Sequence, residues 1–203
     1  MNIEVKISSK PVPYIRALNT LEKRVMDVEK GTKRELIWIL EHPVTFTAGI
    51  RSKPNEVLDK KIRIIKTNRG GKVTLHSPGQ KIIYFVINLN NRKKDIRRLI
   101  NILEESLIEF FSVYKIKARS DKKNIGIWAK NKKISAIGIK VKRWIAYHGC
   151  SININNDLKL YEKIVPCGLN NKKITSLKKL KVKKFRKVNN NIKTIFLKNL
   201  SKI

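Results

Sequence analysis

Residues 125–169 read IGIWAKNKKISAIGIKVKRWIAYHGCSININNDLKLYEKIVPCGL, and the pattern of this stretch decides the fold. Residues 124–130 and 133–144 are rich in alternating apolar residues, with a polar turn at 131–132 between them, so the pattern predicts a β-hairpin. A further strand is expected over 145–154, where apolar residues again alternate with small and polar ones. The stretch therefore indicates a sheet at the centre of the molecule.

The same stretch contains an amine and a thiol in constrained positions. Lys133 follows the expected turn, and Cys167 lies between Pro166 and Gly168, where the backbone is stiff. The thiolate is the reactive form of cysteine, and a neighbouring ammonium stabilises it. We interpret Cys167 as a nucleophile that Lys133 helps to ionise, although by spacing alone any of the many lysines could serve. Cys150, in an alternating strand, is interpreted as a small packed residue.

Outside this stretch, strands and helices continue to alternate. Apolar residues at helical spacing predict helices over 14–28, ending at Gly31, and over 95–114. A short helix is expected over 158–164 and a terminal helix over 191–200, and residues 51–60 have the polar composition of a surface loop. Further strands are expected over 3–7, 35–40, 62–65 and 82–89. We therefore predict an α/β fold of the α+β type, a single domain over residues 1–203 with a mixed β-sheet flanked by helices.

Composition restricts the class of protein. A chain of 203 residues can form one domain with a substantial core, and its longest apolar runs are too short to cross a bilayer, so no membrane partner is expected. The net charge of +32 suggests nucleic-acid binding as one hypothesis. However, the lysines are spread along the chain, and AT-rich codon usage is a competing explanation of the charge. Nucleic acid is therefore not expected as the main partner. Two cysteines do not make a disulfide framework, and no secretory leader is visible, so a reducing, cytoplasmic setting is expected.

Residues 69–80 join two expected strands and contain three glycines, a proline and a histidine. Gly70 and Gly71 can bring backbone N–H groups close to a ligand, whereas an ordinary turn is the alternative. His42, His76 and His148 each lie at a strand end or a glycine-rich turn. They lack the spacing of metal ligands, so we expect no metal and assign them packing or hydrogen-bonding roles in a pocket.

Several ordered blocks resemble one family, the lipoyl(octanoyl) transferases, also called octanoyl-[acyl-carrier-protein]:protein N-octanoyltransferases. The blocks cover most of the chain and include Glu41-His-Pro43, Arg69-Gly-Gly71, Val73-Thr-Leu-His-Ser-Pro-Gly-Gln80, Gly126-Ile-Trp128, Lys133-Ile-Ser-Ala-Ile-Gly138, Arg143-Trp144, Tyr147-His-Gly149, Asn153-Ile-Asn155, Pro166-Cys-Gly168 and Ile174-Thr-Ser-Leu177. Ser77 departs from the family's usual glycine, Cys150 replaces a residue that is commonly aromatic or aliphatic, and little beyond about residue 181 can be matched.

The resemblance implies the fold of the biotin and lipoate protein ligase catalytic domains and a two-step acyl transfer without a cofactor. The donor would be octanoyl-acyl carrier protein. The acceptors would be lysines of the lipoyl domains of 2-oxoacid dehydrogenase complexes and of the glycine cleavage H protein, in the first step of protein lipoylation from endogenous octanoate. An ATP-dependent lipoate or octanoate ligase on the same fold is the alternative, and it would give Cys167 no role.

The resemblance also implies the site. Cys167 would carry the acyl group as a thioester, and Lys133 would lower the pKa of its thiol. His148 and His42 are further candidates for the pocket. The implied substrate-binding residues are Arg69, Gly70, Gly71, Lys72, Val73, Thr74, Leu75, His76, Ala136, Ile137, Gly138, Gly149, Cys150 and Ser151.

Overall fold

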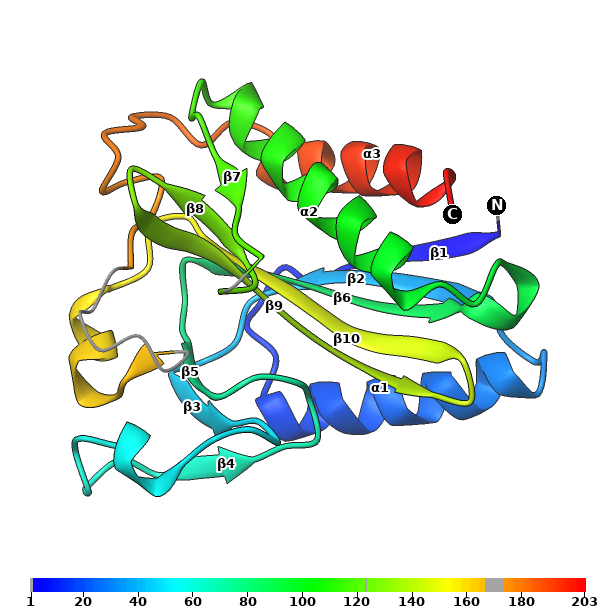
Figure 1. Ribbon diagram of the computed structural model, residues 1–203, viewed down its shortest axis with the longest axis horizontal. Coiled ribbons are helices and arrows are strands. Elements are labelled where there is room, and N and C mark those ends of the chain that lie inside the picture. The colour runs from blue at the N-terminus through cyan, green and yellow to red at the C-terminus, as the bar shows by residue number, and fades with distance from the viewer. Residues whose placement is uncertain (1, 123, 167–173) are drawn as a thin grey trace.

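A seven-stranded sheet forms the frame of the molecule, whose computed structural model describes residues 2–122, 124–166 and 174–203 (Figure 1). Only the β1–β2 pair is parallel and the other neighbouring pairs are antiparallel, so the sheet is mixed, as the sequence predicts. In spatial order its strands are β1 (Ile3–Ile7), β2 (Glu35–Leu40), β6 (Gln80–Asn88), β10 (Ile145–Asn153), β9 (Lys132–Lys142), β8 (Ile127–Ala129) and β7 (Arg119–Ser120).

Two tight turns join β8, β9 and β10 into consecutive hairpins. Lys130 and Asn131 have φ angles of 46° and 58°, and Arg143 and Trp144 have φ angles of 47° and 62°. Two successive residues with positive φ form a type I′ turn, whose twist matches that of the flanking strands. The predicted hairpin is confirmed, with its first turn one residue earlier than expected.

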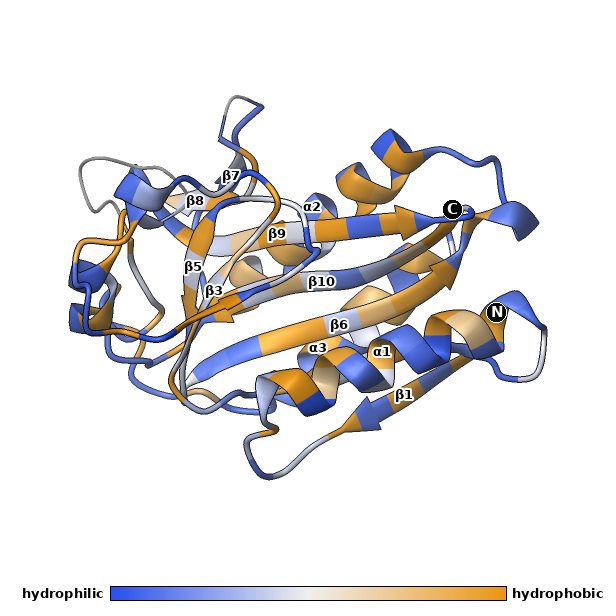
Figure 2. Cartoon of the chain, turned by 90° about the horizontal axis from the view of Figure 1, so that it is seen from below, coloured by the Kyte–Doolittle hydropathy of each residue, from blue (hydrophilic) through white to orange (hydrophobic). Residues whose placement is uncertain are grey.

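Helices cover both faces of the sheet. Helix α1 (Tyr14–Glu29) lies across one face near β6, whereas α2 (Ile96–Val113) and α3 (Val188–Leu200) cover the other (Figures 1 and 2). The predicted end of α1 is confirmed, since Gly31 follows it with a φ of 72°. Helix α3 begins three residues earlier than the sequence indicated.

The buried face of α2 differs from the predicted one. The expected stripe consisted of Ile96, Ile100, Leu103, Leu107, Phe111 and Tyr114. The side chains that the structure buries are Leu99, Ile102, Leu103, Ser106, Leu107, Phe110 and Phe111. The helix is rotated because it packs against α3 as well as the sheet, and α3 could not be placed from the sequence of α2.

A second, three-stranded sheet corrects the prediction of one sheet. Its order is β4 (Ile64–Lys66), β3 (Thr45–Ala48) and β5 (Val73–His76), with β3–β4 parallel and β3–β5 antiparallel. Strand β5 lies inside the segment 69–80, which we had interpreted as a connecting loop. The 3₁₀ turns are η1 (Pro54–Glu56), η2 (Leu89–Asn91) and η3 (Lys159–Lys163), and η3 is the short helix expected before Pro166.

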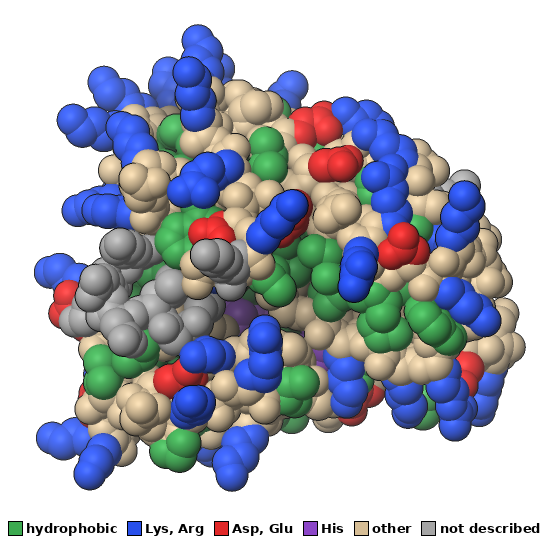
Figure 3. Space-filling model, viewed as in Figure 1, with side chains coloured by type: hydrophobic (Ala, Val, Ile, Leu, Met, Phe, Trp, Pro, Cys, Tyr) green, Lys and Arg blue, Asp and Glu red, His purple; other side chains and the backbone are tan. Residues whose placement is uncertain are grey.

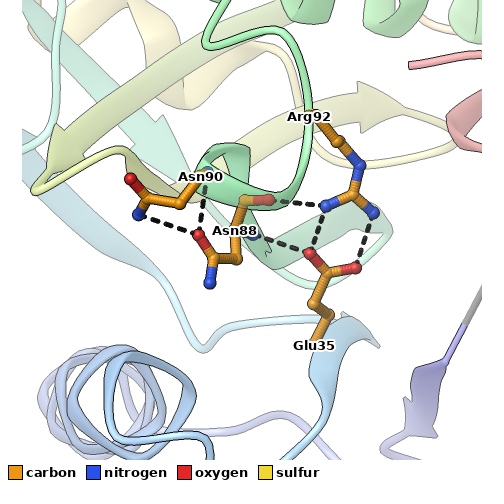
Figure 4. Close-up of polar contacts among 4 residues, drawn as sticks. All are labelled: Glu35, Asn88, Asn90 and Arg92. Carbon is orange, nitrogen blue, oxygen red and sulfur yellow. Dashed lines mark hydrogen bonds and ion pairs between the residues drawn. The ribbon is translucent and has the colours of Figure 1, made fainter.

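An ion pair fastens the end of β6 to the start of β2. The Arg92 guanidinium donates to both Glu35 carboxylate oxygens, at 2.5 and 2.8 Å, and to the Asn88 carbonyl at 2.6 Å (Figure 4). Glu35 also accepts the Asn88 backbone N–H at 2.7 Å.

Within the described residues, no helix combines the length and the apolar character needed to cross a membrane.

Candidate active site

A cavity of about 340 Å³ lies where the loop before β5 passes over β9, β10 and β6. Figure 3 shows histidine side chains deep in a hollow on this face, with Lys and Arg side chains around its rim. The lining residues are Arg51, Arg69, Gly70, Gly71, Lys72, Thr74, His76, Ile82, Tyr84, Asn124, Ile125, Lys133, Ala136, Ile137, Gly138, His148, Gly149, Cys150 and Ser151.

Glycines allow the loop to touch the sheet. The Gly70 N–H donates to the Ile139 carbonyl at 3.2 Å, and a Cβ at Gly70 would lie 2.9 Å from that oxygen. A Cβ at Gly138 would lie 3.0 Å from the Gly70 carbonyl. Real Cβ atoms essentially never approach backbone as closely as 2.9 Å, and at 3.0 Å the neighbouring backbone has to shift. A side chain at Gly70 would therefore push the loop off the sheet, and one at Gly138 would strain the same contact.

Neutral oxygens hold the Arg69 guanidinium. Its nitrogens donate to the Thr47 carbonyl and hydroxyl at 3.0 and 2.8 Å, and to the Gly70 and Lys72 carbonyls at 3.0 and 2.9 Å. The residue is only 8% exposed, and its Nε has no partner in the described part of the chain. A buried cation without a carboxylate partner retains an uncompensated positive charge, which favours an electron-rich ligand.

The Lys133 amine is held at the cavity by a carbonyl and an aromatic ring. Its Nζ donates to the Ile125 carbonyl at 2.8 Å and lies 5.4 Å from the centre of the Trp128 ring, and the residue is 5% exposed. Gly126, with a φ of 134°, makes room for the side chain, since a Cβ there would lie 2.9 Å from Lys133 Cε. The carbonyl and the ring face both favour a cation at this position.

A hydrogen-bond chain orients His76. Its Nδ1 lies 2.9 Å from Gln80 Oε1, and Gln80 Nε2 donates to Asn153 Oδ1 and to the Tyr161 hydroxyl, both at 2.9 Å. These donations fix the Gln80 amide, so His76 carries its proton on Nδ1. Burial lowers the pKa of His76 well below its usual range, with smaller contributions from His42 and Arg69. The imidazole is therefore neutral, and its buried Nε2 is an acceptor with no partner among the described residues.

His42 lies behind Tyr84 and does not line the cavity, unlike the expectation. Its Nδ1 donates to the Val12 carbonyl at 2.6 Å, so its Nε2, 2.8 Å from the Tyr84 hydroxyl, accepts that hydroxyl's proton. Burial lowers the pKa of His42 to about 4 and raises the pKa of Tyr84. Tyr84, which the sequence did not single out, therefore presents oxygen lone pairs at the cavity wall.

His148 reaches the cavity through an unusual backbone conformation. It has a φ of 68° in the middle of β10, where the pairing with Phe85 and Ile139 continues without a register shift. Its ring stacks on the ring of Tyr147, with 4.7 Å between centroids, although side chains of successive strand residues normally point to opposite faces. Its Nε2 donates to Asn68 Oδ1 at 2.7 Å, and burial lowers its pKa to about 3.

The structure places most of the predicted site residues around this cavity. Val73 and Leu75 are the exceptions in the glycine-rich segment, since the alternation of β5 turns their side chains into a small apolar cluster with Phe46 and Ile164. Cys167 lies outside the described residues. Arg51, Ile82, Tyr84, Asn124 and Ile125 also line the cavity and were not predicted. Of these, only Tyr84 carried a signal, a single hydroxyl in an otherwise apolar strand.

Cys150 lies at the cavity, but its thiol is buried on the other face of the sheet and protonated. It is 4% exposed and belongs to the apolar core beneath α2, and burial raises its pKa far above its usual range. A thiol without an ionised fraction is a poor nucleophile.

In the described part of the chain, no three His, Cys, Asp or Glu side chains are grouped as a metal ion would require.

Comparison with known proteins agrees with this architecture. The family model of the lipoyl protein ligase A/B catalytic domain matches residues 13–196. An octanoyltransferase from Ehrlichia chaffeensis is 41% identical over 184 residues, which cover 88% of this chain and 86% of the relative. An octanoyltransferase from Anaplasma phagocytophilum is 40% identical over 186 residues, which cover 89% of each.

Solved structures share the fold at low identity. A bi-partite lipoate protein ligase from Thermoplasma acidophilum has a TM-score of 0.73 at 14% identity, covering 98% of this chain and 84% of that one. The biotin protein ligase from Aquifex aeolicus in complex with biotin and ATP has a TM-score of 0.58 at 16% identity, covering 99% of this chain and 71% of that one. The predicted ligase-like α/β fold is confirmed. Together with the sequence relatives, it establishes that the chain is an acyltransferase of the octanoyltransferase family, within the lipoyl protein ligase A/B catalytic-domain family.

Proposed function

We propose that the chain, as one catalytic domain, transfers an octanoyl group from octanoyl-acyl carrier protein to a lysine of a lipoyl-accepting domain through a thioester on Cys167. In the first step the Cys167 thiolate attacks the donor thioester. A new C–S bond forms as the donor's C–S bond breaks, and the carrier's thiolate takes up the proton that the Cys167 thiol lost on ionising. In the second step the lysine amine attacks the acyl-enzyme and releases the thiol. Because the donor is already a thioester, neither step requires ATP.

The observation that carries this proposal is the buried amine of Lys133 at the cavity. A desolvated ammonium stabilises a nearby thiolate much more strongly than a solvated one does, because the interaction is less screened. The Ile125 carbonyl and the Trp128 ring keep this amine in place.

The residues on both sides of the Cys167 segment support the proposed pairing of Cys167 with Lys133. The Val165 N–H donates to the Glu56 carbonyl at 2.7 Å, and the Glu56 carboxylate binds Lys72 at the cavity at 3.0 Å. Beyond the segment, Ile174 pairs with Lys133, and the Thr175 N–H donates to the Lys133 carbonyl at 2.9 Å. The described chain on either side of Cys167 is thus attached to the cavity.

Intact-mass measurement tests the proposal. Incubation with octanoyl-carrier protein in the absence of ATP is expected to add one octanoyl group, which hydroxylamine removes. The Cys167→Ser variant should form no hydroxylamine-labile thioester, whereas Cys150→Ala should be acylated normally. A thioester adduct on Cys167→Ser, or acylation that requires ATP, would contradict the proposal, and the second result would favour a ligase.

Thiol alkylation tests the role of Lys133 separately. In the Lys133→Ala variant, iodoacetamide should modify Cys167 more slowly at neutral pH, because less of the thiol is ionised. Lys133→Arg is the matched control, since it retains a positive charge. Equal alkylation rates in the wild type and in Lys133→Ala would remove Lys133 from this role.

The proposed partners fit the charge of the chain. The net charge of +32 favours encounter with an acidic carrier, and salt screens such attraction. The apparent KM for the carrier should therefore rise with ionic strength, and an unchanged KM would leave codon bias as the explanation of the charge. The lipoyl domains of 2-oxoacid dehydrogenase complexes, the glycine cleavage H protein and a reducing, cytoplasmic setting complete the proposal.

A further inference from the structure

Three neutral hydrogen-bond acceptors line one wall of the cavity, and their proton positions follow from their partners. His76 donates through Nδ1 to Gln80, which leaves Nε2 as an acceptor. His148 donates through Nε2 to Asn68, whose amide is fixed by its donation to Glu22 at 2.9 Å, which leaves Nδ1 as an acceptor. The Tyr84 hydroxyl donates to His42 and retains its lone pairs.

The charged groups of the same cavity are all cationic. Arg51, Arg69, Lys72 and Lys133 line it, and no Asp or Glu does so among the described residues. Lys72 is paired with Glu56, whereas within the described residues Arg69 and Lys133 donate to neutral oxygens and have no carboxylate partner. A ligand that must donate hydrogen bonds here therefore has to be uncharged, because a further cation would be repelled.

We propose that His76, Tyr84 and His148 bind the uncharged ε-amino group of the acceptor lysine and orient it toward the acyl group. This assignment rests on the proposed function and names the residues that serve its second step. The amine nitrogen forms the C–N bond of the amide as the C–S bond of the thioester breaks. The nitrogen loses one proton and the departing thiolate gains one, so the step is balanced if the amine arrives without its third proton.

The backbone of His148 supports a functional placement. A left-handed φ is unfavourable for a residue with a Cβ, and such conformations persist where the surrounding structure enforces them. A regular strand at this position would turn the ring toward the core beneath α2. The strained conformation instead places the ring beside Tyr147 and Tyr84 at the cavity. Asn68 and Glu22 then hold the ring in that orientation.

Two substitutions of His148 distinguish the effect of its side-chain acceptor from the effect of its backbone conformation. Asparagine and glycine both tolerate a left-handed φ, but only asparagine retains a side-chain acceptor. The octanoyl-enzyme is isolated, mixed with excess lipoyl domain, and its single-turnover transfer rate is measured, while its formation from octanoyl-carrier is measured separately. We expect His148→Gly to slow transfer about 10- to 100-fold and His148→Asn much less, with acyl-enzyme formation changed less than about threefold.

The pH profile gives a second readout. In His148→Gly, the pH at which transfer reaches half its maximum should rise toward the free lysine pKa of about 10.4. The groups facing these imidazoles are Tyr14 from α1, His42 just after β2, Tyr84 from β6, Arg69 from the loop, and Lys140 from β9. Tyr84→Phe removes one acceptor of the cavity wall without altering the strained backbone of His148. It should raise the pH of half-maximal transfer in the same direction, but by less.

The outcomes are distinguishable from a failure of the proposed function, because acyl-enzyme formation is scored on its own. Slower acylation with unchanged transfer would mean that the wall binds amide N–H groups of the donor's arm, and it would overturn the assignment. Equal slowing of both steps, or equal behaviour of His148→Gly and His148→Asn, would reduce His148 to a structural role. A Tyr84→Phe variant with wild-type transfer would remove the hydroxyl from the wall.

Discussion

Acid should destabilise the protein well before its carboxylates titrate, because its histidines are buried in the neutral form. Burial lowers the pKa of His42 to about 4 and that of His148 to about 3, whereas an unfolded chain keeps histidine near 6.5. Below pH 6.5 the unfolded chain therefore binds protons that the folded chain does not. The folded state therefore keeps its full stability above pH 6.5. It loses stability progressively as the pH falls toward the folded-state pKa values of these histidines.

The size of the effect follows from the two pKa values. At pH 5.0 each histidine should cost about 2 kcal/mol of unfolding free energy relative to pH 7.5, or about 4 kcal/mol for the pair. His76 adds a cost of the same sign, since its pKa is also lowered. Because domains of this size are commonly stable by about 5–15 kcal/mol, the loss is a large share of the total.

Urea unfolding followed by tryptophan fluorescence at pH 7.5 and 5.0 measures this loss. The His148→Asn variant is the test protein, because asparagine does not titrate and accepts the left-handed backbone. Its loss between the two pH values should be about 2 kcal/mol smaller than that of the wild type, whatever its stability at pH 7.5. The carboxylates with a lowered pKa, Glu4, Asp59 and Glu109, are common to both proteins and cancel. Identical losses in the two proteins would refute the neutral, buried state of His148.

Three further outcomes are expected. Gly126→Ala should slow the alkylation of Cys167 and lower Tm, because a Cβ at a φ of 134° would lie 2.9 Å from Lys133 Cε; an unchanged alkylation rate would show that the amine does not depend on this glycine. Cys150 should resist iodoacetamide in the native protein and react after unfolding, as peptide mapping would show, and rapid native labelling would contradict its burial. Glu35→Gln should cost about 2 kcal/mol in urea unfolding, since it leaves the mostly buried Arg92 side chain without its carboxylate partner; a loss near zero, as for a solvated pair, would argue against the double contact.

Local sequence patterns were sufficient for the elements that local chemistry controls. The hairpin turn between β8 and β9, to within one residue, the Gly31 helix end and the apolar strands β2 and β6 were predictable, because turn residues and hydrophobic periodicity act within a few positions. The Arg69–Gly71 loop and Lys133 were selected by the resemblance of ordered blocks, and the structure places both at one cavity.

The tertiary structure decided which side chains meet. Strand β5 turns Val73 and Leu75 away from the cavity, and the pairing of β2 with β6 places His42 behind Tyr84. The left-handed φ of His148 cannot be inferred from a strand pattern, because alternation predicts the opposite face. Which face a residue presents depends on long-range pairing and on backbone strain that distant neighbours impose, and neither is encoded in the spacing of nearby residues.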